Sequence, residues 1–457
     1  MRRMHQTAVD LLTLDSAPEA HETPAAAPAQ APVRWRLATR VAFRLTSLYF
    51  TLYVLTTQML GGLLPLPIGE MPDLGATGYM KGIVSWTTVH VFRVGHPFLT
   101  VNTGSGDKTI DWVQTFCLLT VAIAGTAVWS ALDRRRPNYV ALHKWFRVVL
   151  RFAVASTMVG YGIVKVIPLQ MGATGLTRLV EPFGNFSPMG VLWASIGASF
   201  PYERVCGAVE MTGAVLLFIP RLSLLGALVT LAASTQIFTL NMTYDVPVKL
   251  FSFHLILMSL ALLAPDVRRL LRLFVLDKAV TASTLPPLVG TVRGRRVALA
   301  VQLVFAAYIL GWNLHDARKS WTEYGGGAPK SPLYGIWNVD EMRVDGVVRA
   351  PRLDDWGRWR RLIFQSPAGM SFQRMNDSFQ GYTNTIDMAG KTLTLSSTAD
   401  KNWTARFAIE QPAADRMILD GAMDGHKVRL DVRRQDRGSF LLVSRGFNWI
   451  QDRPFNR

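Results

Sequence analysis

The sequence predicts a polytopic α-helical membrane protein that carries a small all-β barrel domain at its C-terminus. Hydrophobic residues make up 49% of the 457 residues and charged residues only 18%, which is too apolar for an ordinary soluble enzyme of this length. Apolar stretches of about 20 residues, the length that crosses a bilayer, recur as far as residue 314. Beyond them, short alternating segments separated by glycine turns indicate β-strands.

The N-terminal segment, residues 1–33, has a different composition from the rest of the chain. It is rich in Ala, Pro, Glu and His, and it lacks an apolar core followed by a small-residue cleavage site. We therefore expect a disordered cytoplasmic tail and no cleaved signal peptide.

About seven candidate spans follow this tail. Residues 34–145 hold two spans joined by a large outer loop, and residues 146–265 hold a four-helix membrane core. A basic cytoplasmic loop at 266–296 precedes the final span at 297–314. The candidate spans are 41–64, 110–132, 146–168, 205–219, 222–240, 248–264 and 297–314.

The distribution of basic residues predicts the orientation. The chain has 49 Lys and Arg against 32 Asp and Glu, and the basic clusters fall between apolar stretches, as cytoplasmic loops require. Clusters at Arg134–Arg136 and in the 266–296 loop place those loops in the cytoplasm. The excess charge therefore indicates membrane topology, and we expect no nucleic-acid partner. Arg34, Arg36 and Arg40 before the first span place the N-terminus in the cytoplasm. An odd span count then puts the C-terminal domain outside a multi-pass inner (plasma) membrane.

Two loops should lie along the bilayer surface. The outer loop at 65–109 is aromatic and is expected to contain an interfacial helix. In the inner loop, Arg268, Arg269 and Arg272 alternate with Leu and Phe residues, which predicts a short amphipathic helix on the anionic leaflet.

A linker at 315–330 leads to the β domain at 331–457. Asp345-Gly346 and Asp424-Gly425 are typical hairpin turns, and evenly spaced strands favour a meander that closes into a small barrel. Its interior either is filled by side chains or holds one apolar ligand, and both readings stay open. The expected strands are 360–365, 391–396, 403–409, 416–419, 427–433 and 439–444.

Residues from about 147 to 264 resemble the DoxX family of bacterial membrane proteins. The similarity is carried by Arg151, by the GYGIVKVIP segment at 160–168 and by the EMTGAVLL segment at 210–217. This resemblance implies a four-helix membrane core and a link to quinone or thiol redox chemistry. A thiol role is disfavoured because Cys117 and Cys206 stand alone in separate apolar segments. The C-terminal domain resembles a lipocalin-like barrel through its Gly335-Ile336-Trp337 opening and its strand rhythm.

Ionisable residues within apolar spans give the strongest chemical signal. Lys165 and Glu210 each cost about 2.5–3.5 kcal/mol to insert into a membrane, so they are expected to pair or to face water. Tyr161 lies one helical turn before Lys165. The pair is either a structural ion pair or part of a site for a quinone head group, a proton or a small polar substrate.

Two further groups could extend this site. Lys249 and His254 enter the sixth span. Their alternative, purely structural roles are an interfacial anchor for Lys249 and a hydrogen-bonded core histidine for His254. Glu181 and Arg204 flank an outer loop that could cover the bundle, or they are simply solvated. His90, His96, His143 and His254 do not give facing axial ligands, so haem is not expected.

Two functions follow from these observations. The first is a component of a redox or quinone-linked membrane pathway, working with a membrane redox partner and holding a quinone. The alternative is a non-catalytic protein that binds a lipid-like or apolar ligand, or docks a partner, through its β domain. The sequence leaves open the substrate, the oligomeric state and whether the protein is an enzyme.

Overall fold

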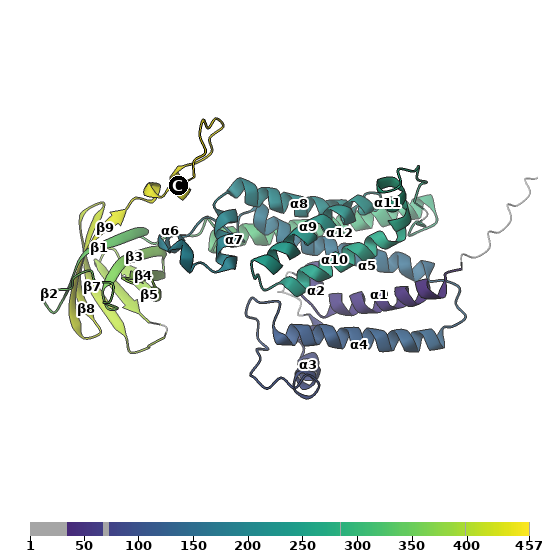
Figure 1. Ribbon diagram of the computed structural model, residues 1–457, viewed down its shortest axis with the longest axis horizontal. Helices are drawn as coiled ribbons and strands as arrows, with labels where there is room; N and C mark the ends of the chain where they lie inside the picture. Colours follow the sequence, from purple (N-terminus) through teal and green to yellow (C-terminus); the bar gives the residue numbers. More distant parts are fainter. Residues whose placement is uncertain (1–33, 67–72, 284, 398, 457) are drawn as a thin grey trace, which may run out of the picture.

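A computed structural model describes residues 34–66, 73–283, 285–397 and 399–456. The chain forms an elongated helical bundle and a separate β-barrel beyond one end of it (Figure 1). We call that end of the bundle the barrel end. The opposite end carries Arg134–Arg136 and the helix α11, and we call it the basic end.

Seven helices occupy the positions of the seven predicted spans. Within the described ranges, five helical segments are long and apolar enough to cross a membrane, namely α4, α5, α9, α12 and the stretch from α10 to Phe274. The helices α1 and α8 are shorter and carry charged residues. The seven are α1 (Leu37–Leu55), α4 (Thr109–Leu132), α5 (Val140–Val166), α8 (Phe200–Phe218), α9 (Ser223–Thr243), α10 (Lys249–Leu263) and α12 (Val292–Glu323).

Helix α5 is the centre of the bundle. It packs against α8, α10, α12, α1 and α2 (Met59–Leu63), and every residue from Leu150 to Val159 is buried. A helix that is apolar on all sides is stable only when neighbours cover it or lipid surrounds it, and here neighbours cover it. Contacts in the order α5–α8–α9–α10 join these four helices into one group.

Short helices connect these elements. At the barrel end, η1 (Leu74–Ala76) and α3 (Gly78–His90) occupy the 65–109 loop, where an interfacial helix is expected. The segments α6 (Leu176–Val180), η2 (Phe183–Asn185) and α7 (Pro188–Gly197) join α5 to α8. At the basic end, η3 (Ala264–Asp266) leads into α11 (Val267–Phe274), which covers the predicted amphipathic segment.

The C-terminal domain is a closed antiparallel barrel of eight strands, because β9 pairs back with β1. A ninth strand, β2 (Val347–Val348), extends only the end of β1. The barrel strands are β1 (Gly335–Val344), β3 (Trp359–Ser366), β4 (Gly369–Arg374), β5 (Phe379–Asp387), β6 (Thr392–Ser396), β7 (Thr404–Ala413), β8 (Arg416–Met423) and β9 (His426–Gln435).

Side chains fill the barrel interior. Alternate residues along the strands form one buried cluster that includes Trp337, Leu362, Phe407 and Leu419, each at most 2% exposed. Of the two readings left open by the sequence, the described residues therefore favour the packed core.

The two hairpin turns at Asp345-Gly346 and Asp424-Gly425 are present, with positive φ at all four positions. A hydrogen bond from His426 lowers the pKa of the Asp345 carboxyl below its usual value.

The strands β1, β4 and β5 are absent from the prediction, and two of the predicted ranges are wrong. Residues 439–444 were expected to form a strand, but they form part of η4 (Arg437–Ser439) and α13 (Leu441–Ser444). The closed barrel leaves no free edge there for another strand, because β9 already pairs with both β8 and β1. The linker is also shorter than expected, since α12 continues past Leu314 to Glu323.

The barrel touches the bundle through the α5–α8 connection. The Leu176 backbone N–H donates to Gln365 Oε1 at 2.9 Å, and Gln373 Nε2 donates to the Val180 carbonyl at 3.1 Å. Leu176 also packs against Ile336 and Ile363 of the barrel. The barrel is therefore attached both covalently through α12 and by contacts with α6 (Figure 1).

The packed barrel core gives the first prediction. Residues 330–457 expressed alone should be soluble and β-rich by far-UV circular dichroism. In this fragment Leu419→Ala should lower the free energy of unfolding by about 2–5 kcal/mol, because it leaves a cavity in the barrel interior. Val347→Ala, at a position 71% exposed, is the control and should change it by less than about 0.5 kcal/mol. A helical or unfolded spectrum would contradict the domain assignment.

Candidate functional site

The ion pair expected from the sequence is formed. Lys165 Nζ, in the last turn of α5, lies 2.6 Å and 2.8 Å from the two carboxylate oxygens of Glu210 on α8. Both side chains are buried, with 8% and 4% exposure. Such a bidentate contact satisfies both charges within the helical part.

Two glycines allow this contact. A Cβ atom on Gly207 would lie 2.6 Å from the Gly162 carbonyl oxygen and 2.8 Å from Lys165 Cβ. A Cβ on Gly162 would similarly meet Gly207 O at 3.0 Å. Small residues let helix backbones approach closely in membrane proteins. The α5–α8 contact therefore depends on glycine at both positions, one turn from the charged pair.

Tyr161 connects the pair to a cavity at the barrel end. Its carbonyl accepts a hydrogen bond from Lys165 Nζ at 3.4 Å, and its hydroxyl accepts one from Gln58 Nε2 at 3.0 Å. Tyr161 lines a cavity of about 540 Å³ between α1, α4, α5, α10 and the 65–109 loop, which we call the outer cavity. The pair thus lies behind the wall of this cavity.

The outer cavity combines apolar walls with polar groups. Tyr53, Leu118 and Phe251 supply apolar surface, while Gln58, Asp111, Gln114 and Lys108 supply donors and acceptors. Some of these groups are already engaged, since Gln114 Nε2 donates to Thr56 O at 2.8 Å. A small number of oriented polar groups on an apolar surface is typical of small-molecule sites.

Lys249 and His254 have their own partners near this cavity. Lys249 Nζ lies 2.9 Å from Asp245 and 3.9 Å from Asp107. His254 Nδ1 donates to Leu250 O at 2.7 Å, so in the neutral ring Nε2 accepts from the Tyr49 hydroxyl at 2.7 Å. Its ring also stacks on Tyr53 at 3.9 Å. Both residues are therefore held by surrounding contacts.

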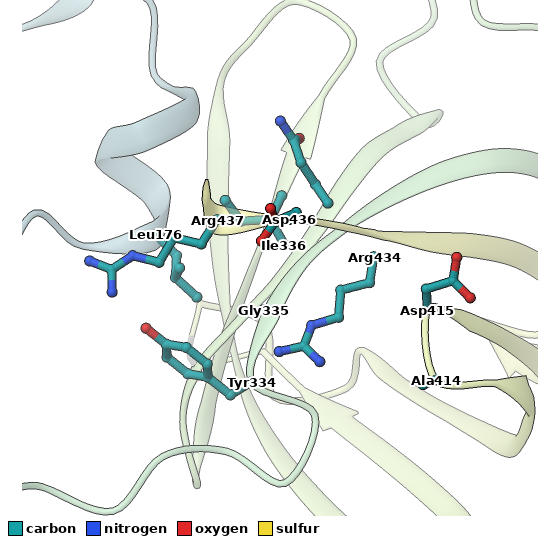
Figure 2. Close-up of a pocket in the computed structure, with 10 residues that line it drawn as sticks. Leu176, Tyr334, Gly335, Ile336, Ala414, Asp415, Arg434, Asp436 and Arg437 are labelled. Atoms are coloured by element: carbon teal, nitrogen blue, oxygen red, sulfur yellow. The ribbon is translucent and has the colours of Figure 1, made fainter. Parts of the chain in front are cut away.

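Glu181 and Arg204 lie away from the ion pair. Glu181 accepts a hydrogen bond from Arg178 at 2.5 Å beside the barrel, and Arg204 is exposed on α8. Near this connection, a crevice of about 480 Å³ at the barrel mouth is lined by Leu176, Tyr334, Asp415 and Arg434, with Arg437 at its edge (Figure 2). Glu181 and Arg204 line neither the outer cavity nor this crevice.

Sequence reasoning gave little weight to Glu203, a fully buried carboxylate. Its Oε1 accepts from the Met171 backbone N–H at 3.0 Å, while its Oε2 has no partner among the described residues. Its place in the first turn of α8, just after Pro201, was the available signal. Among the described residues, His, Cys, Asp and Glu form no group that could hold a metal ion.

Comparison with known proteins gave one informative similarity. The chain is 31% identical over 134 residues to the uncharacterized protein YwoB of Bacillus subtilis (strain 168). The matched segment makes up 29% of this chain and 85% of YwoB. No family model matches the chain, and no solved structure matches it. The similarity therefore spans most of the relative and less than a third of this protein.

The geometry of the pair gives the second prediction. Lys165→Met and Glu210→Gln should each destabilise the protein in detergent by about 3–5 kcal/mol, because each leaves one buried partner unpaired. The double variant should recover much of this loss. A double-mutant cycle from reversible unfolding in mixed SDS micelles measures the coupling.

The exposed pair of Lys319 and Glu323, whose charged atoms are 3.8 Å apart on α12, provides the matched control. The same cycle there should give coupling of about 0–1 kcal/mol. Coupling of Lys165 and Glu210 no larger than this control would mean that the two buried residues do not interact.

Proposed function

The chain belongs to the same protein family as YwoB. From its architecture we propose that it is a multi-pass membrane protein that binds a quinone in the outer cavity. In this proposal α5, α8, α9 and α10 form a DoxX-like core. The protein works in a redox or quinone-linked pathway of the bacterial inner membrane, and the lipid bilayer surrounds its apolar helices.

The observation that carries the proposal is the outer cavity itself. Its volume of about 540 Å³ falls in the range of about 300–1,000 Å³ that is usual for small-molecule sites. A quinone has a flat apolar ring that needs apolar or aromatic walls, and two carbonyl oxygens that need hydrogen-bond donors. Tyr53 and Phe251 offer the walls, and the Tyr161 hydroxyl offers a donor.

The ion pair behind Tyr161 fits this chemistry. Reduction of a quinone takes up two electrons and two protons, and Lys165 and Glu210 are proton-carrying groups one residue layer from the cavity. Cys117 and Cys206 are both free and lie on different helices, so the chain offers no dithiol for electron transfer. A membrane redox partner would therefore supply or accept the electrons.

A second candidate is docking of an extracytoplasmic partner through the C-terminal domain. The segment after the barrel exposes Phe447, Trp449 and Ile450, each at least 80% exposed. Aromatic residues are enriched where proteins bind one another. This candidate relies on the outside of the domain, because the barrel interior is occupied by side chains.

The third prediction tests the quinone. Protein purified in mild detergent from bacterial membranes should retain quinone, detected by organic extraction and mass spectrometry. Tyr161→Phe should weaken binding of added decylubiquinone about tenfold, because it removes one hydrogen bond worth about 0.5–1.5 kcal/mol. Tyr202→Phe, at a position 54% exposed on α8, is the control and should leave affinity unchanged. A wild-type protein that neither retains nor binds quinone would refute the proposal.

The fourth prediction tests the orientation. The basic end carries Arg134–Arg136, and clusters of this kind are retained in the cytoplasm. A reporter fused after Arg457 should therefore behave as extracytoplasmic, while one fused at Arg136 should behave as cytoplasmic. Paired phosphatase and fluorescent-protein fusions provide the measurement, and cytoplasmic behaviour at Arg457 would reverse the proposed topology.

A further inference from the structure

A second cavity, of about 530 Å³, lies at the basic end between α5, α12 and the loops around α11. Among the described residues, six Lys and Arg side chains line it against one carboxylate, that of Asp266. We call it the basic pocket. Its cationic residues are Lys144, Arg147, Arg151, Arg221, Arg269 and Arg295.

We propose that the basic pocket binds a phosphate-bearing anion, supplied either by the head group of an anionic phospholipid or by a free phosphorylated solute. This inference is independent of the outer cavity, which lies at the opposite end of the bundle.

The positive charge in the pocket is only partly neutralised from within. Asp266 Oδ1 accepts a hydrogen bond from Arg269 Nη1 at 2.5 Å and another from Ser283 at 3.4 Å. No carboxylate lies within 4 Å of the Arg147 or Arg151 guanidinium among the residues that the structure describes. Six cations therefore converge on a single carboxylate among the described residues, and that carboxylate is paired with Arg269.

Two of these guanidinium groups have buried donors that are unused in the described part of the chain. Arg151 is 93% buried, as its exposure is 7%, and its Nε has no hydrogen-bond partner in the described part of the chain. Its Nη2 donates to Gln302 on α12, which orients the group. The Nη1 atom of Arg147 is also buried and has no hydrogen-bond partner among the described residues. An unpaired buried charged group is costly unless a ligand satisfies it.

A third arginine at the same end, Arg44, has hydrogen-bond acceptors within the chain for its guanidinium group. Arg44 is 1% exposed and donates to Tyr139 Oη at 3.0 Å, Ser130 Oγ at 2.8 Å and the Asp133 carbonyl at 2.8 Å. Arg151 lacks such a complete set of acceptors. The contrast indicates that acceptors for the pocket arginines come from outside the chain.

Topology alone does not explain the position of these residues. Cytoplasmic loops retain basic residues in solvent, as at the exposed Arg135. Arg147 and Arg151 instead lie within α5, which begins at Val140, and they are four residues apart on one helix face. Like charges at this spacing repel, and an anion between them would remove the repulsion.

The donor set indicates the class of ligand. Guanidinium groups offer planar, paired donors that match phosphate oxygens, and several of them suit an anion with more than one charge. The adjacent α11 exposes Leu271, Leu273 and Phe274 beside its arginines, which is typical of a helix lying at an anionic membrane surface. A phospholipid head group could therefore enter from the same surface.

The fifth prediction tests the pocket with the full chain in detergent after lipid removal. Adding phosphatidylglycerol, or inorganic pyrophosphate, should raise the melting temperature, whereas phosphatidylcholine should not. Stabilisation by phosphatidylglycerol alone identifies a lipid head group, and stabilisation by pyrophosphate identifies a soluble phosphate. Arg151→Gln and Arg147→Gln should each weaken the effective anion affinity about tenfold, as expected for loss of a charged hydrogen bond.

Arg135→Gln removes the same charge from the same end of the bundle and is the matched control, with affinity expected to stay unchanged. Without ligand, Arg151→Gln should change the melting temperature little, because the guanidinium has no carboxylate within 4 Å in the described structure and loses only its hydrogen bond to Gln302. No stabilisation of the wild type by either anion would overturn the proposal. Equal losses in the pocket variants and in Arg135→Gln would also overturn it, because they would indicate general surface charge.

Discussion

The close approach of α5 and α8 at Gly162 and Gly207 is the contact on which the helical part depends. It brings Lys165 to 2.6 Å from Glu210, and it lies near the C-terminal end of α5, the helix at the centre of the bundle. A side chain at either glycine would separate the helices by the width of a methyl group. The buried lysine would then lose its partner, and a charge alone in this setting is far more costly than the pair.

Helix α5 carries cations at both ends, and the two ends differ in how those cations are satisfied. At the barrel end, Lys165 has a carboxylate from the next helix. At the basic end, Arg147 and Arg151 have none within 4 Å in the described structure. The Lys165–Glu210 ion pair is complete within the chain and stabilises the helix bundle. Arg147 and Arg151 lack a carboxylate partner, which is consistent with an anionic ligand from outside the chain. This difference assigns the two ends separate roles, even though the same helix positions both.

Much of the fold could be predicted from the sequence because its signals are local. Apolar length located the seven helices, and Asp-Gly turns located two hairpins. The prediction of a strand at 439–444 was wrong because barrel closure depends on contacts between distant segments. The pairing of β9 with β1 joins residues almost 100 positions apart.

The candidate site was predicted in part for the same reason. Lys165 and Glu210 stand out in any apolar span. The Gln58–Tyr161 hydrogen bond and the outer cavity bring distant segments together, so no local sequence pattern predicts them.

The attachment of the barrel constrains what that domain can do. Its interior is packed and its first strand is fixed to the bundle by α12, while α6 contacts β3 through Leu176 and Gln365. The α5–α8 connection thus leaves the helix of Lys165, contacts the barrel through α6 and returns to the helix of Glu210. A domain joined to the bundle only by a flexible linker would lack these contacts.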